Sequence, residues 1–405
     1  MKGNLKNLIA LIVAVFICLS VFVLKYEDIK QYRLKENLKI ALLLSENLST
    51  YDVENHRSAA TNLSESFKID SSKILIKEKV LETECFKIVE DAVNDGYNLI
   101  FAVGKDLEDY IVQSATEHPK VQYCIADSKL AITSGMDNLH SYSLNEAESR
   151  YLAGVVAGMK LNDLIDNGEI REEQAIIGYV GSFDNAENIS AYTAFYLGAK
   201  SVVPSVDMKV KFTESEYDED LEKKTANALI ANGCVLLVQQ SNTNSIAENC
   251  EQYGVYYVGC LQVSADIAPN FAVVSTYEDW SVCYAQIVDS IIKDEDLPSG
   301  WYSSIDTSAV GVTEINKNAF ASTNKYDETK RLVNEIQEKL KSDMLHIFDT
   351  ANWKVSGETI ASTATEILRV DYSGVEYIEK GRFVEYELTP IPKFAFKIDG
   401  IEILS

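Results

Sequence analysis

Short apolar runs alternate with segments of helical periodicity twice along this sequence. In the first series, at residues 39–139, the apolar runs include Lys39–Leu44 and Asn98–Val103. A second series, at residues 175–276, repeats the scheme. Strands that alternate with helices of this length form parallel sheets with right-handed crossovers. The sequence therefore predicts an α/β protein with two strand–helix halves and one segment between them.

The segment between the two halves, Ser143–Met159, is predicted to be a thin helix. Its apolar stripe recurs at helical spacing and consists of Tyr151, Leu152, Val155, Val156 and Met159. Ser143 or Asn145 can cap it. Gly154 and Gly158 each cost about 1 kcal/mol relative to alanine inside a helix, so we expect another backbone to approach them closely. The helix is predicted to carry the chain from one lobe to the other.

Three other segments carry specific predictions. The polar segment Ser45–Asn55 is predicted to be a loop after the first strand, and Arg57–Phe67 a helix. Thr329–Leu345 is predicted to be an amphipathic helix whose apolar face includes Met344. Residues 362–405 are predicted to hold short β segments, at Glu366–Val370, Phe383–Leu388 and Phe394–Ile398.

The uncharged segment Leu8–Leu24 is a candidate membrane segment. As a helix it would span ~25 Å, near the lower limit for crossing a bilayer. An uncleaved anchor, a lipoprotein signal modified at Cys18 and a cleaved signal peptide are all open. Small residues suited to cleavage are missing from Val21–Leu24, and bulky ones precede Cys18. The anchor is therefore favoured, and the predicted location is the cell membrane, with the binding domain extracytoplasmic.

Composition argues against a nucleic-acid partner and against catalysis. The net charge of −25 does not suit a phosphate backbone, which needs clustered Lys and Arg. None of the four histidines lies beside a plausible Ser or Cys nucleophile, and no phosphate-binding Gly-Lys-Ser/Thr loop occurs. We therefore predict no catalytic residues and no enzyme activity.

The cysteines beyond Leu8–Leu24 argue against a metal site and a cofactor. They form no Cys-x-x-Cys pair and have no histidine companions. Cys124, Cys234 and Cys260 lie in apolar runs and are predicted to be small buried hydrophobes. Spacing alone leaves disulfide pairing open.

Several segments together resemble one family. They are Gly96–Gly104, Glu117–Tyr123, Tyr151–Gly154 and Ile177–Gly181, with further matches at Phe195–Pro204, Ala226–Gly233 and Gly254–Gly259. In this order and spacing the chain resembles the basic membrane protein (BMP) family, the substrate-binding components of ABC importers that include purine nucleoside receptors. The likeness covers residues 38–355. It implies a type I periplasmic-binding-protein fold, in which two Rossmann-like lobes close on a ligand at a hinge.

The strand–helix halves and the resemblance together predict four parts. Residues 1–36 form the N-terminal membrane anchor or signal and a stalk. Lobe 1 comprises 37–142 plus 277–305, and lobe 2 comprises 143–276 plus 306–350, with three crossovers between them. Residues 351–405 form a C-terminal β-rich extension.

Candidate ligand-binding residues follow the carboxyl ends of the predicted strands, where open α/β sheets bind ligands. They are Ser45, Tyr51, Asn55, Asp127, Phe183, Gln240, Asn242 and Trp280. Asp127 matches the family best, and its carboxylate would accept hydrogen bonds from ribose hydroxyls or a base edge, or else cap the next turn. Tyr51, Phe183 and Trp280 can stack on a flat base, or else only pack.

The sequence also departs from the family at two places. Where the family carries an aspartate and then Asp-x-Ser-Phe-Asn, this chain has Ser45 and Tyr51–Asn55, so that Tyr51 would replace the stacking phenylalanine. The family's ribose-gripping Asp-Ser-Asp falls on Leu261–Val263, which lacks both carboxylates. Each lost partner of a buried hydroxyl costs about 1–3 kcal/mol, so weaker ribose recognition is expected.

These observations lead to two hypotheses on function. In the first, the protein is an extracytoplasmic solute-binding protein of an ABC importer. It would capture a small, flat, uncharged solute, with a purine nucleoside or base as the first candidate, and pass it to the permease subunits. In the alternative, it is a membrane-anchored ligand sensor or surface interaction protein with the same fold and no transport role.

Overall fold

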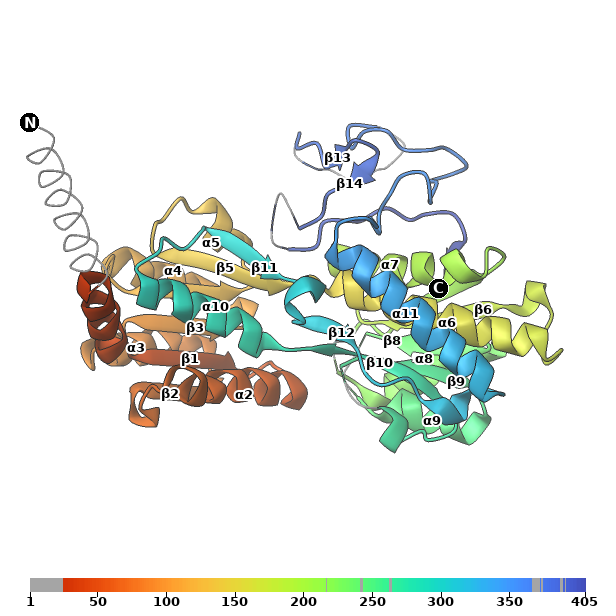
Figure 1. Cartoon of the computed structure of the whole chain (residues 1–405), viewed down its shortest axis with the longest axis horizontal. Coiled ribbons are helices and arrows are strands. Elements are labelled where there is room, and N and C mark those ends of the chain that lie inside the picture. The colour runs from red at the N-terminus through yellow and green to blue at the C-terminus, as the bar shows by residue number, and fades with distance from the viewer. Residues whose placement is uncertain are drawn as a thin grey trace, which may run out of the picture.

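The computed structural model describes residues 25–215, 217–240, 243–261, 264–365, 372, 374–386, 389 and 391–405. Within them, two separate sheets carry most of the strands (Figure 1). The first sheet has the order β11 (Gly300–Ser303), β5 (Leu139–Leu144), β4 (Gln122–Ala126), β3 (Leu99–Val103), β1 (Ile40–Ser45), β2 (Ile74–Val80). The second has the order β12 (Val310–Val312), β10 (Ala272–Glu278), β9 (Tyr256–Gly259), β8 (Leu236–Gln239), β6 (Ile176–Gly181), β7 (Asp207–Phe212), β15 (Ile401–Ile403).

Helices cover both sheets, which explains why the central strands are apolar along their whole length. Every residue of β1 and β3 is buried, as expected of parallel strands covered on both faces. Strand pairing is parallel throughout the two sheets except between β10 and β12. After the helical residues 25–37, the helices are α2 (Thr50–Phe67), α3 (Glu82–Asn94), α4 (Glu108–Glu117), α5 (Lys129–Thr133), α6 (Glu146–Asp166), α7 (Ala186–Val202), α8 (Glu219–Ala231), α9 (Ser245–Tyr253), α10 (Trp280–Lys293) and α11 (Thr323–Lys341). Both halves are therefore α/β units built on mainly parallel sheets, as the sequence predicted.

The chain passes between the two sheets three times. It leaves the first sheet after β5, returns from the second sheet after β10, and leaves again after β11 to form β12. Figure 1 shows these connections running side by side between the two halves. We call the region of these three connections the hinge. Because β5 and β10 both end there, residues at their carboxyl ends come together.

Helix α6 packs directly on α7, as the glycines of the sequence predicted. A Cβ atom on Gly154 would lie 2.0 Å from the carbonyl oxygen of Phe195, and one on Gly158 would lie 2.8 Å from that of Ala199. On α7, a Cβ atom on Gly198 would lie 2.1 Å from the carbonyl oxygen of Tyr151. The prediction of close backbone approach is therefore confirmed. Asn145 occupies the cap position but makes no side-chain cap bond, and Ser143 lies within β5.

Helix α2 corrects the prediction of a loop at Ser45–Asn55. The helix begins at Thr50, because the Ser49 hydroxyl accepts a hydrogen bond from the Asp52 N–H at 3.1 Å. Asp52 also places negative charge in the positive first turn. The predicted start at Arg57 is therefore one to two turns too late.

Helix α11 and the C-terminal segment differ from their predictions too. Ser322 caps α11, which ends at Lys341, and Met344 lies beyond it with 70% of its surface exposed. In the described part of residues 351–405, the strands are Ile378–Glu379 (β13), Arg382–Phe383 (β14) and β15, while the predicted segment Glu366–Val370 lies outside the described residues. Phe394, Phe396 and Ile398 alternate as strand residues do, but they bury their side chains without a neighbouring strand.

An aromatic cluster holds this C-terminal segment together instead. Phe348 stacks on Phe394 at 4.3 Å between ring centroids, and Trp353 stacks on Phe396 at 5.4 Å. Strand β15 then pairs in parallel with β7 at the edge of the second sheet. We call residues 343–405 the C-terminal extension.

The predictions on the membrane segment and on the cysteines have different outcomes. Leu8–Leu24, with Cys18, lies outside the described residues. Among the residues that are described, no helix has the length and apolarity needed to span a bilayer. The cysteines of the described chain are all free and buried, at positions 85, 124, 234, 250, 260 and 283.

Candidate functional site

A cavity of about 370 Å³ lies between the two sheets, beyond the carboxyl ends of their strands. One wall is the first turn of α2. The opposite wall comes from the approaches to α8 and α9, which follow strands of the second sheet. The lining residues are Ser49, Thr50, Tyr51, Glu54, Tyr217, Glu219, Thr243, Asn244, Ser245 and Glu248. A polar space of this size, walled by both halves, can hold a small solute.

Two of the predicted residues at the end of β1 have structural partners. The Ser45 hydroxyl is buried and donates to an Asp106 carboxylate oxygen at 2.7 Å. Asn55 donates through Nδ2 to the Glu278 carbonyl oxygen at 3.2 Å, which ties α2 to the hinge. Tyr51 by contrast lines the cavity. The pKa of Tyr51 is raised by burial and by the nearby Glu278 carboxylate, so its hydroxyl is a hydrogen-bond donor at neutral pH.

Asp127 lies where the strand-end rule predicted, just after β4. Its backbone is in the left-handed region, with φ of 52°, and its side chain is exposed. Ser128, not Asp127, caps α5, because its hydroxyl accepts from the Ala131 N–H at 2.9 Å. The surrounding protein, and then the Glu187 and Glu146 carboxylates, raise the pKa of Asp127. The carboxyl group is therefore not used as a cap and faces other acids.

The residues predicted on the second-sheet side differ in their surroundings. Phe183 is half-buried in the connection from β6 to α7. The Gln240 side-chain oxygen accepts from the Tyr179 hydroxyl at 2.5 Å, and the Gln240 side chain also hydrogen-bonds Glu146. Asn242 lies outside the described residues.

Trp280 packs in the first half of the molecule, at the start of α10. Only 8% of its surface is exposed. Its ring centroid lies 4.6 Å from that of His56 and 5.6 Å, edge to face, from that of Tyr142. This packing favours the alternative of a core residue over that of a stacking surface.

Sequence reasoning missed a charged group at the hinge. Arg150 of α6 is 1% exposed, and it donates to the Gln239 carbonyl oxygen at 3.2 Å and to the Cys260 sulfur at 2.9 Å. Its guanidinium lies 3.8 Å from a Glu146 carboxylate oxygen. Cys260 is thus buried as predicted, but it has a charged partner. The cationic Arg150 therefore attracts the Glu146 carboxylate at the start of α6, next to the hinge.

Glu278, the last residue of β10, is the second missed group. Its pKa is raised well above the ordinary value, first by burial and then by the Glu146 carboxylate, while Arg150 opposes the effect. Burial also raises the pKa of Glu146, to about 7, and Arg150 again opposes it. The sequence offered one signal for Glu278, since it lies at the carboxyl end of a strand, the place where Asp127 was predicted to contact a ligand.

The segment aligned with the family's ribose-gripping aspartates is only partly described. Leu261 has φ of 61°, and its N–H donates to the Thr276 hydroxyl at 3.3 Å. Gln262 and Val263 lie outside the described residues. The local geometry therefore provides an apolar side chain and no carboxylate at Leu261.

Comparison with known proteins identifies similar sequences and folds. The family model described as "ABC transporter substrate-binding protein PnrA-like" matches residues 49–342. A purine-binding protein of Brucella abortus is 25% identical, over 65% of this chain and 71% of its own length. A putative ABC transporter glucose-binding protein of Haloferax volcanii is 22% identical, over 67% of this chain and 64% of its own length. Among solved structures, an ABC transporter solute-binding protein from Conexibacter woesei has a TM-score of 0.60 at 19% identity, covering 76% of this chain and 98% of that one.

Proposed function

Because this chain belongs to the family of PnrA-like ABC transporter substrate-binding proteins, we propose that it captures a small solute between its two sheets and delivers it to an ABC permease. The observation that carries the proposal is the polar cavity of about 370 Å³, which both halves line next to the three connections of the hinge. A site divided between two halves closes when they rotate about the hinge, and closure removes the ligand from water.

We assign the two lobes as 37–142 plus 277–305 and 143–276 plus 306–350. Two short strands support this division. Strand β11 pairs with β5 in the first sheet, and β12, only a few residues later, pairs with β10 in the second. The third crossover therefore falls between Ser303 and Val310.

A purine nucleoside or base is the first candidate ligand. Tyr51 and Phe183 are proposed to stack on the ring, and Asp127 and Gln240 to hydrogen-bond it, with Asn242 from the neighbouring segment. Glu146 and Glu278 extend the polar side of the site. The purine-binding relative supports a base, and the glucose-binding relative supports a hydroxyl-rich alternative. Both classes present N–H or O–H donors, which carboxyl groups bind well.

A ligand screen on the full chain tests this proposal. Guanosine, inosine, adenine, hypoxanthine and glucose are compared by thermal shift and then by calorimetry. A ligand at 100 times its Kd stabilises the folded state by about 2.7 kcal/mol, which a melting curve detects easily. Binding of a purine compound supports the proposal. Binding of glucose alone would move the ligand to the sugar class, and no binding by any probe would contradict solute capture.

A second candidate function is a ligand sensor without transport. One observation favours it: the C-terminal extension begins where the family match ends, and it packs over the hinge. Transport assays in cells that express this protein with and without an ABC permease separate the two functions. Uptake that depends on both this protein and a permease supports import, while ligand binding without any uptake supports the sensor.

We also propose that Leu8–Leu24 anchors the protein at the outer face of the membrane. The proposal rests on its uncharged sequence and on the lack of small residues at Val21–Leu24. Mass spectrometry of the mature N-terminus provides the test. A chain that begins at a lipid-modified Cys18, or after Leu24, would overturn the anchor.

A further inference from the structure

The C-terminal extension is fastened firmly to the second half of the molecule. Strand β15 pairs with β7, with Ile401 opposite Met208 and Ile403 opposite Val210. Lys397 forms an ion pair with Asp184, which lies just before α7. The family match stops at residue 342, so these attachments belong to a part of the chain that the family model does not include.

Glu385 forms the third attachment, and it is buried. Its Oε1 accepts hydrogen bonds from the N–H groups of Lys393 at 2.8 Å and Phe394 at 2.7 Å. Its Oε2 accepts from the Ser190 hydroxyl of α7 at 2.7 Å. With 5% of its surface exposed and three donors satisfied, this side chain holds residue 385 rigidly against α7.

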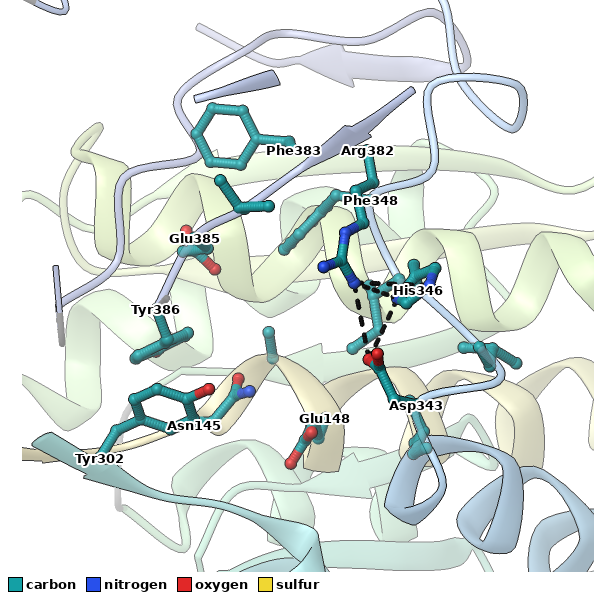
Figure 2. Close-up of a pocket in the computed structure, with 15 residues that line it drawn as sticks. Asn145, Glu148, Tyr302, Asp343, His346, Phe348, Arg382, Phe383, Glu385 and Tyr386 are labelled. Atoms are coloured by element: carbon teal, nitrogen blue, oxygen red, sulfur yellow. Dashed lines mark hydrogen bonds and ion pairs between the residues drawn. The ribbon is translucent and has the colours of Figure 1, made fainter. Parts of the chain in front are cut away.

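The very next residue contacts the other half. The ring of Tyr386 lies 5.4 Å from that of Tyr302, which belongs to β11 of the first sheet. Figure 2 shows the two rings next to each other, beside Asn145 at the start of α6. Tyr386 is 6% exposed. Adjacent residues of the extension therefore touch opposite sides of the hinge.

The contact across the hinge is not solidly packed. A cavity of about 130 Å³ lies between the extension, the start of α6 and β11 (Figure 2). The side-chain oxygen of Asn145, which lines it, is buried and has no hydrogen-bond partner among the described residues. Space of this kind lets the halves move relative to each other without breaking a dense core.

We propose that Glu385 and Tyr386 form a clamp across the hinge, and that Tyr386 is a positioning residue for ligand retention. The Glu385–Ser190 hydrogen bond fixes the clamp to α7 in the second half of the molecule. The Tyr386–Tyr302 ring contact restrains β11 in the first half. This inference rests on the proposed solute capture between the two halves.

Four variants of the full chain test the clamp with inosine as the probe: Tyr386→Ala, Tyr386→Phe, Tyr302→Ala and the double alanine variant. Loss of one aromatic pair is expected to raise the dissociation rate of inosine about threefold to tenfold in Tyr386→Ala. Tyr386→Phe keeps the ring and should restore the wild-type rate. The double variant should match Tyr386→Ala, because both substitutions remove the same contact. Tyr253→Ala, at an exposed tyrosine of α9, is the control.

A measurement without ligand keeps the test independent of solute capture. Spin labels at Glu65→Cys in α2 and Lys224→Cys in α8, both exposed, report the distance between the halves, since the other described cysteines are buried. The clamp predicts a broader distance distribution in Tyr386→Ala than in Tyr386→Phe. If inosine does not bind the wild type, solute capture of nucleosides fails while this result still decides the clamp. Equal distributions and equal dissociation rates in all variants would overturn it, and so would a Phe variant that behaves like Ala.

Discussion

Three carboxyl groups lie at or just after the carboxyl ends of strands, near the hinge, and make this region acidic. Asp127 follows β4, Glu278 ends β10, and Glu146 starts α6 after β5. Each has a raised pKa, because nearby protein atoms displace part of the surrounding water and because like charges repel, although Asp127 itself stays exposed to solvent. Arg150 is the cation that compensates them from within α6. Such a site suits a ligand that donates hydrogen bonds and disfavours an anion.

Asp127→Asn should weaken binding of whichever purine compound proves to be the ligand. A hydrogen bond to a charged group is worth about 1.5–3 kcal/mol, so the Kd is expected to rise roughly tenfold or more. Calorimetry measures this directly. Asp207→Asn, at an exposed position at the start of β7, should leave the Kd unchanged. Equal affinities of Asp127→Asn and wild type would exclude this carboxylate from the site.

Glu385 should make stability depend on pH. Burial raises its pKa to about 7, so between its unfolded value of about 4.5 and 7 the folded state holds the proton more tightly. Stability therefore falls as pH rises through this window, by roughly 3 kcal/mol at most, and this effect is complete above pH 7. The difference between the melting curves at pH 5 and pH 8 should be smaller in Glu385→Gln than in the wild type. The exposed Glu379→Gln serves as the control, and an unchanged pH slope in Glu385→Gln would contradict the assignment.

Only part of the site could be predicted from single residues. The strand-end rule placed Tyr51 on the cavity and Asp127 just after β4, because the rule depends only on local alternation of strands and helices. It could not show that Ser45 is committed to Asp106 or that Trp280 packs on His56, since those partners are distant in sequence. Arg150 was missed because its partners, Gln239 and Cys260, lie 89 and 110 positions away in the sequence.

Among the helices, the α6–α7 pair gives the second half its rigidity. The backbones come so close that the glycines interlock, with Gly154 facing Phe195 and Gly198 facing Tyr151. The intrinsic cost of glycine in a helix is offset here by contact that no larger residue permits.

Gly154→Ala should therefore destabilise the protein, although alanine is the better helix former. The new Cβ would overlap a backbone carbonyl at 2.0 Å, and overpacking of this kind costs about 1–3 kcal/mol. Denaturant unfolding measures the change. Asn162→Ala, on a half-buried position of the same helix, should change stability little. A stabilised Gly154→Ala would show that the two helices can separate freely.

The boundaries of elements were predictable only where the periodicity was strong. The helix α6 and the central strands follow from repeated apolar spacing. The early start of α2 depends on the capping hydrogen bond at Ser49. That bond is not apparent from the sequence, because the residues around it are polar as they would be in a loop. In the C-terminal extension, the alternation of Phe394, Phe396 and Ile398 does not produce a strand, because ring-on-ring contacts such as Phe348 with Phe394 organise this segment. The prediction of a strand at Phe394–Ile398 was therefore wrong.

At the scale of the whole molecule, solute capture predicts that the two halves close around the ligand. Small-angle scattering should show a smaller radius of gyration when a saturating purine ligand is added, because the halves rotate toward each other about the three connections of the hinge. The ligand shifts the population only if it binds the closed form better. The Asp127→Asn variant at the same ligand concentration should remain more open. An unchanged radius in a chain that demonstrably binds ligand would contradict closure.

Pairing of β15 with β7 also sets an order of events in time. Lys211, at the end of β7, and Ser405 are 194 positions apart, and contacts between such distant segments are slow to form. The second sheet can therefore reach its full width only late in folding. Until then the edge of β7 stays open, and open strand edges recruit other chains. Refolding should accordingly be most prone to aggregation before β15 docks, and it should depend on protein concentration during that interval.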